Sequence, residues 1–219
     1  MGRLTAAAAA VLTVATLTLA PALVHASPSP RAGCRSGYEY GGYATREGVH
    51  GVVATVSASE QPRVATGHAA AWVGVGGVHV GRSGESEWLQ AGIAAFPETG
   101  LRLYVEAVSP GTKRRFVDLG PAQRGRRYRV GVTEVAANVW QAAVAGRAVG
   151  TPVYLPPARG AWRGIATSES WRTAAAPCNR YAFRFANVSV RGTTWTALGA
   201  AERVGRGVTR SGAAFAATA

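Results

Sequence analysis

Short hydrophobic segments that alternate with polar residues dominate this sequence, and glycine or proline stands between most of them. Period-two alternation is typical of β-strands with one buried face, whereas helices need apolar residues three or four positions apart. We expect strands at 52–57, 68–74, 87–96, 101–108, 127–135, 139–145, 151–155, 164–171 and 180–191. The pattern predicts an all-β fold, an antiparallel β-sandwich, with a helix only in the N-terminal segment.

The N-terminus has the features of a signal peptide. Arg3 supplies a positive charge, and an uncharged apolar run follows from Ala6 to Leu23. Val24 and Ala26 are the small residues that a signal peptidase requires, so we expect cleavage after Ala26 and export from the cell. The alternative is an uncleaved membrane anchor, but the proline-rich stretch that follows favours cleavage. We expect no integral membrane span in the mature chain.

About 190 residues remain after cleavage, which suits a single domain. We expect a lead segment at 27–37, a β-sandwich domain at 38–196, and a C-terminal strand or flexible tail at 197–219. We expect the protein to be a monomer.

Cys34 and Cys178 are the only cysteines. In an exported protein, an isolated pair is most simply interpreted as a disulfide. The alternative, two buried thiols, is less favoured outside the cell.

The chain carries a net charge of +13, almost all of it from arginine. Such a charge suggests nucleic acid or an anionic surface as a partner. The arginines are scattered, and the densest groups, at 113–115 and 124–129, fall where turns or strand starts are expected. We therefore interpret the charge as a solvated surface and expect no specific nucleic-acid partner.

Three of the expected strands, 87–96, 101–108 and 164–171, alternate between small or apolar residues and larger polar or aromatic ones. Such strands suit a curved sheet with one face on the core and one face in solvent. Gln90, Glu106 and Glu169 fall on the open face. We expect them to share a groove lined by Trp88, Tyr104 and Trp171.

Most catalytic schemes lack the necessary residues. The one aspartate after the signal peptide, Asp118, falls in an expected turn and is a poor member of a Ser-His-Asp triad. No zinc-binding spacing occurs, and Gly74–Gly77 does not lead into a helix, so we expect no metal and no cofactor. His68 and His79 fit surface or satisfied core positions.

Carboxylate chemistry remains. A partly buried glutamate can activate a water molecule, and an amide can stabilise the oxyanion that forms. Glu169 and Gln90 suit these roles by type and by strand face, although a polar residue on an open sheet face is often merely solvated.

Several segments resemble the glutamic peptidases, or eqolisins. Ala71–Gly77 and Trp88–Ile93 are similar to the family's A-W-V-G-I-D-G and L-Q-T-G motifs. Gly164–Glu169 falls where the family has A-E-W-I-V-E, with Ile165 at the first glutamate and Glu169 at the second. Phe185–Ser189 matches F-T-N-A-S. The likeness covers most of the mature chain.

This resemblance implies a concanavalin A-like jelly roll of two seven-stranded sheets and a secreted endopeptidase that cleaves polypeptides at acid pH. Gln90 takes the place of the oxyanion-stabilising glutamine and Glu169 that of the catalytic glutamate. The substrate-binding residues would then be Trp72, Trp88, Tyr104, Glu106 and Trp171.

Two noncatalytic functions remain open. Concanavalin-like sheets often present aromatic side chains to glycans, and Trp72, Trp88, Tyr104, Trp162 and Trp171 would be the contacts of a carbohydrate-binding module. Alternatively, the basic surface would attach the protein to an anionic cell envelope.

Overall fold

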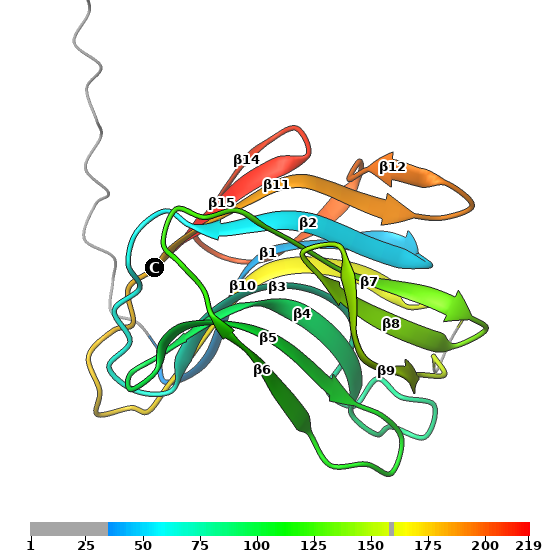
Figure 1. Cartoon of the computed structure of the whole chain (residues 1–219), viewed down its shortest axis with the longest axis horizontal. Coiled ribbons are helices and arrows are strands. Elements are labelled where there is room, and N and C mark those ends of the chain that lie inside the picture. The colour runs from blue at the N-terminus through cyan, green and yellow to red at the C-terminus, as the bar shows by residue number, and fades with distance from the viewer. Residues whose placement is uncertain (1–34, 158–159) are drawn as a thin grey trace, which may run out of the picture. The chain divides into compact units, whose positions relative to one another are not determined.

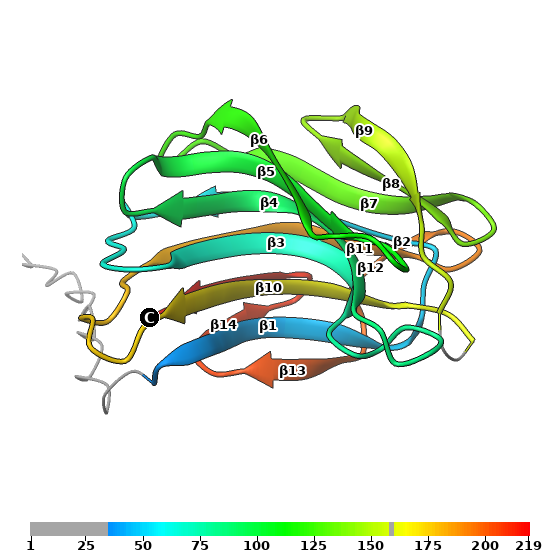
Figure 2. The same ribbon diagram turned by 90° about the horizontal axis from the view of Figure 1, so that it is seen from below.

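The computed structural model describes residues 35–157 and 160–219, and every regular element among them is a β-strand. Seven strands form the first sheet, in the order β13 (Ala201–Gly205), β1 (Gly37–Gly48), β10 (Arg163–Arg172), β3 (His68–Gly77), β4 (Glu87–Phe96), β5 (Gly100–Val108) and β6 (Arg115–Pro121). We call this sheet A (Figure 2).

The second sheet, sheet B, has eight strands. Its order is β14 (Val208–Ser211), β15 (Ala214–Thr218), β11 (Ala182–Arg191), β2 (Gly51–Ala58), β7 (Tyr128–Ala136), β8 (Val139–Val144) and β9 (Arg147–Tyr154), with β12 (Trp195–Ala197) paired to β11. The two sheets face each other (Figure 1). The all-β sandwich is thus confirmed, and sheet B has one strand more than the resemblance implied.

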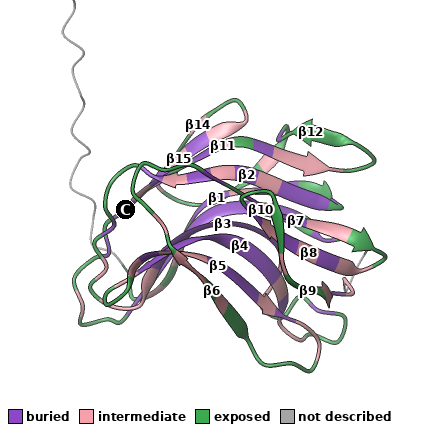
Figure 3. Cartoon of the chain, in the orientation of Figure 1, coloured by how far each residue is buried: buried purple, intermediate pink, exposed green. Residues whose placement is uncertain are grey.

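The main core lies between the sheets, where the buried residues concentrate (Figure 3). From sheet A, Leu89, Ala91 and Ile93 of β4 are at most 1% exposed, and from sheet B, Phe183 and Phe185 of β11 are equally buried. Alternate residues of β4 therefore point away from this core, as the period-two pattern predicted. Those residues build the other face of sheet A, on which the candidate site lies.

Strand β1 was not predicted, because two glycines interrupt its alternation. A Cβ atom on Gly42 would lie 2.3 Å from the carbonyl oxygen of Ala166 and 2.4 Å from the Cα atom of Thr167. Glycine therefore allows β1 to approach β10 closely. The result is a strand that runs beside the one carrying Glu169.

Strand β6 was also missed, and the prediction that Asp118 lies in a turn was wrong. Asp118 belongs to β6, and its Oδ2 atom lies 3.0 Å from Nε of Arg102 on β5. The strand is short and largely exposed, so its sequence lacks the buried alternation that identifies longer strands.

The C-terminal residues contribute to both sheets. Strand β13 extends sheet A beside β1, whereas β14 and β15 extend sheet B beside β11. Phe215 of β15 stacks on Phe185 with ring centroids 4.2 Å apart. Most of the residues from 201 onward therefore lie in strands.

The signal peptide, most of the lead segment and Cys34 lie outside the described residues, so cleavage and the Cys34–Cys178 disulfide stay predictions. Within the part of the chain that is described, no helix has the length and apolar character needed to cross a membrane.

Candidate active site

Four neighbouring strands of sheet A, β10, β3, β4 and β5, position the candidate catalytic residues. Gln90 on β4 lies directly opposite Glu106 on β5. On its other side Gln90 lies opposite Gly74, which in turn lies opposite Ile165 on β10. On the open face, Gln90 therefore has Glu106 beside it on β5. On the other side Gly74 lies next to it on β3, and Ile165 lies beyond Gly74 on β10.

Glu169 lies on the same face of β10 as Ile165, four positions further along the strand. It lies opposite Ala70, and Ala70 lies opposite Ala94. On a flat sheet this offset would place the Cα atoms of Glu169 and Gln90 about 16 Å apart. The sheet is curved (Figure 1), and both side chains reach the same small pocket.

The carboxylate of Glu169 is held from two sides. Its Oε1 atom lies 2.8 Å from Nε2 of His68, and Trp72 Nε1 donates a hydrogen bond of 3.2 Å to Oε2. Glu169 is 9% exposed and Trp72 is 8% exposed. These contacts fix the orientation of the carboxylate and leave part of it open to the groove.

Glu106 has different partners. Trp88 Nε1 donates to its Oε1 at 3.0 Å, and Arg114 Nη2 donates to its Oε2 at 2.8 Å. Arginine is a permanent cation, so this carboxylate is engaged in an ion pair whenever it is ionised. Glu106 therefore suits a structural or substrate-orienting role better than that of a general base.

Gln90 is 8% exposed, and its Nε2 donates to Oη of Tyr104 at 3.3 Å. Burial, and then the charges of Glu169 and Glu106, raise the pKa of Tyr104 well above its ordinary value. The phenol is therefore protonated at every physiological pH and keeps a hydrogen to donate. Gln90 and Tyr104 together form a neutral set of hydrogen-bond donors.

These groups surround a pocket of about 10 Å³, which is about the size of one water molecule. The pocket is lined by His68, Ala70, Gln90, Ala94, Phe96, Tyr104, Glu106, Arg114, Phe116 and Glu169. A carboxylate, a neutral amide and a phenol thus line one small pocket.

The expected aromatic residues have unequal positions. Trp72 contacts Glu169, Trp88 contacts Glu106, and Tyr104 contacts Gln90. Trp171 lies further out, where its ring centroid is 6.4 Å from that of Tyr38. Of the four expected aromatic residues, only Tyr104 lines the pocket, whereas Trp72 and Trp88 support the two carboxylates that line it.

Sequence reasoning missed the role of His68. It was interpreted as a surface or core residue, but its side chain is mostly buried and contacts Glu169. It shares its strand face with Ala70 and Trp72, so the period-two pattern would have placed it on the open face.

Sequence reasoning also missed Tyr38 and Tyr40 on β1, whose rings stack 6.1 Å apart and are 52% and 36% exposed. Burial, and then the charge of Glu169, raise the pKa of Tyr40. Tyr40 lies opposite Glu169 and Tyr38 lies opposite Trp171, so both tyrosines are on the same face as the site. They were missed because β1 itself was not predicted.

Nothing in the arrangement resembles a metal centre. Across residues 35–157 and 160–219, no three histidine, cysteine or carboxylate side chains are grouped so as to hold a metal ion.

Comparison with solved structures identifies the same architecture in known peptidases. Scytalido-glutamic peptidase, solved with a peptide-based transition-state analogue, matches with a TM-score of 0.62 and 16% identity over 81% of this chain and 96% of that chain. SCP-B, an eqolisin peptidase solved with a tripeptide, matches with a TM-score of 0.56 and 15% identity, over 81% and 96% of the two chains.

No protein-family model matches the sequence, and no curated protein sequence matches it either. At such low identity the structural likeness shows the fold alone. The chain has the fold of the glutamic peptidases, with a glutamate, a glutamine and a water-sized pocket on the open face of sheet A.

Proposed function

We propose that this protein is a secreted glutamic-type endopeptidase in which Glu169 is the general base and Gln90 stabilises the oxyanion. The observation that carries the proposal is that both side chains line one pocket with room for about one water molecule. The fold shared with peptidases that bind peptide ligands supports a polypeptide as the substrate.

The reaction would begin with a water molecule in this pocket. Glu169 accepts a proton from the water while the water oxygen attacks the carbonyl carbon of the peptide bond. The carbonyl oxygen becomes an oxyanion, which accepts a hydrogen bond from Nε2 of Gln90. Glu169 then donates its proton to the amide nitrogen, the C–N bond breaks, and an amine and a carboxylic acid leave.

The other groups orient the reactants. His68 and Trp72 hold the carboxylate of Glu169, so little reorganisation is needed when it accepts the proton. Tyr38 and Tyr40 offer exposed rings beside the groove, against which the side chains of an extended polypeptide would pack. We expect activity at acid pH, as the likeness to the glutamic peptidases implies.

The direct test is proteolysis of denatured casein by the purified mature protein from pH 2 to 7. Glu169→Gln should lower kcat by about 100-fold or more, because a general base contributes about 10²–10⁴-fold to rate. Gln90→Ala should lower it by about 100-fold. Glu60→Gln and Gln123→Ala are matched controls, since both side chains are exposed outside the groove. Cleavage by both site variants at the wild-type rate would rule out this pair.

One observation favours a second candidate, a noncatalytic binding protein. Ile165, rather than a carboxylate, occupies the β10 position in register with Gln90. In that case the groove would bind an extended polymer, a polypeptide or a glycan, without cleaving it. Wild-type protein that binds casein or an arrayed glycan without producing new amino termini would support this candidate.

The variant Ile165→Glu separates the two candidates. It places a carboxylate across Gly74 from Gln90, on a strand face that already carries Glu169. If the wild-type protein does not cleave peptide bonds, Ile165→Glu should acquire that activity. If Glu169 is the base, cleavage does not need the new carboxylate and activity should not rise.

Export is part of the proposal. The signal peptide predicted for residues 1–26 implies a mature protein that begins at Ser27. Intact mass of protein recovered from the culture medium would test both the cleavage site and the predicted disulfide, which removes two hydrogen atoms from the mass. Recovery only in the membrane fraction, with residue 1 retained, would contradict it.

A further inference from the structure

The strands of the two sheets differ in their balance of basic and acidic residues. The strands of sheet B contain five arginines, Arg129, Arg147, Arg184, Arg191 and Arg210, and one acidic residue, Glu134. The strands of sheet A contain six arginines but seven of the eleven acidic residues of the chain. Sheet B is therefore basic, whereas sheet A is close to neutral.

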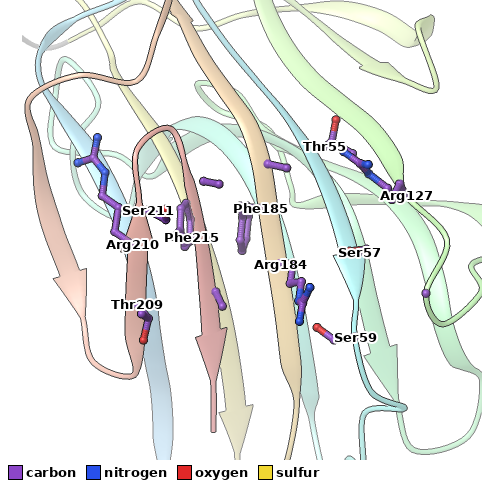
Figure 4. Close-up of a pocket in the computed structure, with 14 residues that line it drawn as sticks. Thr55, Ser57, Ser59, Arg127, Arg184, Phe185, Thr209, Arg210, Ser211 and Phe215 are labelled. Atoms are coloured by element: carbon purple, nitrogen blue, oxygen red, sulfur yellow. The ribbon is translucent and has the colours of Figure 1, made fainter. Parts of the chain in front are cut away.

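A broad cavity of about 710 Å³ lies on sheet B, along β2, β11 and β15 (Figure 4). Arg127 and Arg184 border it, and hydroxyl groups from Thr55, Ser57 and Ser59 of the β2 region line it. None of the residues that line it is acidic. We call this cavity the arginine groove.

The two arginines lie on either side of β2. Arg184 on β11 lies directly opposite Ser57, and Arg127 immediately precedes β7, the other neighbour of β2. In Figure 4 the side chain of Arg127 lies beside Thr55 and that of Arg184 beside Ser59. Each guanidinium therefore has a hydroxyl group close by, at a different point along the groove.

Both guanidinium groups are available to a ligand. Arg127 and Arg184 are exposed, and neither side chain forms a hydrogen bond or ion pair with any other residue in the described part of the chain. Arg210, at the far side of the groove, differs because it donates to the carbonyl groups of Leu198 and Gly199. Arg127 and Arg184 thus have free donors, whereas Arg210 supports the fold.

We propose that the arginine groove binds a linear polyanion that carries phosphate or sulfate groups. A guanidinium with a neighbouring hydroxyl offers several donors to one anion, which suits the three outer oxygens of a phosphate or sulfate ester. Two such positions along one groove suit a polymer with repeated anionic groups. This site lies on the sheet opposite the candidate active site and does not depend on the proposed hydrolysis.

The groove is poorly suited to single-stranded nucleic acid. Binding of single strands uses exposed aromatic rings on which bases stack. The two rings that line this groove, Phe185 and Phe215, are 1% and 5% exposed and belong to the core. A polyanion without bases is therefore the better match.

The test is a titration of the mature protein with fluorescently labelled heparin fragments and with polyphosphate, at several salt concentrations. The double variant Arg127→Ala/Arg184→Ala should weaken binding by about 10-fold or more and reduce the salt dependence. The matched control Arg147→Ala/Arg203→Ala removes the same charge from exposed positions outside the groove and should change affinity by less than about 3-fold. Ser57→Glu, which places a carboxylate between the two arginines, should also weaken binding.

The results distinguish the sources of the anion and can overturn the proposal. Binding of heparin alone assigns sulfate esters, and binding of polyphosphate alone assigns phosphate. An equal loss of affinity in both double variants would show that binding depends on net charge rather than on the arginine groove. Tighter binding of polyglutamate or single-stranded DNA than of heparin or polyphosphate would assign another class of ligand. Either result, or no binding near physiological salt, overturns the proposal.

Discussion

His68 Nε2 lies 2.8 Å from Oε1 of Glu169, across the pairing of β3 with β10. Both side chains are largely buried, and they are 101 positions apart in the sequence. The contact gives the candidate base a fixed orientation. In the proposed mechanism His68 is a positioning residue, and its loss should affect catalysis without removing the base itself.

We expect His68→Gln to lower kcat for casein cleavage by about 10- to 100-fold, since small misplacements of a catalytic group have effects of this size. KM should change little, because the described contact of His68 is with Glu169 rather than with the substrate. His79→Gln, in an exposed loop, is the control. A wild-type rate in the His68 variant would show that the contact has no role in the reaction.

Glu106→Gln should affect binding rather than chemistry. The substitution removes the ion pair with Arg114 and retains the shape of the side chain. Arg114 is then held less firmly beside the pocket, while the contacts of Glu169 are unchanged. We expect KM to rise by about 3- to 10-fold with kcat within about 3-fold of wild type. Glu202→Gln, which breaks an exposed ion pair with Arg163, is the control. A large loss of kcat with unchanged KM would instead make Glu106 a catalytic residue.

Stability should decrease as the pH rises from about 4.5 to about 7. Burial, and then the neighbouring Glu85 carboxyl, raise the pKa of Glu87 from 4.5 to about 7. Between these values the folded state keeps the proton and the unfolded state releases it, so the free energy of unfolding falls with pH and then levels off.

Thermal unfolding at pH 4.5 and pH 7.5 should therefore show a midpoint lower by about 5 °C at the higher pH. In Glu87→Gln this difference should shrink. A wild-type midpoint that rises over the same range would contradict the assignment to Glu87.

Gly42→Ala should destabilise the protein by about 2 kcal/mol or more, because the new methyl group would overlap the backbone of β10 at Ala166 and Thr167. Gly199→Ala is the matched control, since a Cβ atom there meets nothing within 4 Å. Chemical denaturation of the two variants measures the difference. Equal stability would mean that β1 does not approach β10 as closely as described.

Period-two alternation predicted the sandwich and the strand faces correctly. It assigned Leu89 to the core and Gln90 to the open face because alternate residues of a strand point to opposite sides. It failed at β1 and β6, where glycines or exposure remove the alternation. The contact of His68 with Glu169 was beyond prediction because it depends on the register of two strands that are far apart in sequence.

The arginine groove was missed for a similar reason. In the sequence the arginines are scattered, and they were interpreted as a solvated surface. Arg184 and Arg127 become neighbours of the same strand only through the order of sheet B. How the charge is divided between the two sheets depends on the order of their strands, and the composition alone does not determine that order.

The proposed mechanism requires Gln90 and Glu169 together to hold the water that attacks the peptide bond. A high-resolution crystal structure of the mature protein at acid pH would locate this water. We expect one ordered water within about 3 Å of both the Gln90 amide nitrogen and a Glu169 carboxylate oxygen. Side chains too far apart to share one water molecule, or a pocket closed by Ile165 and Tyr104, would contradict it.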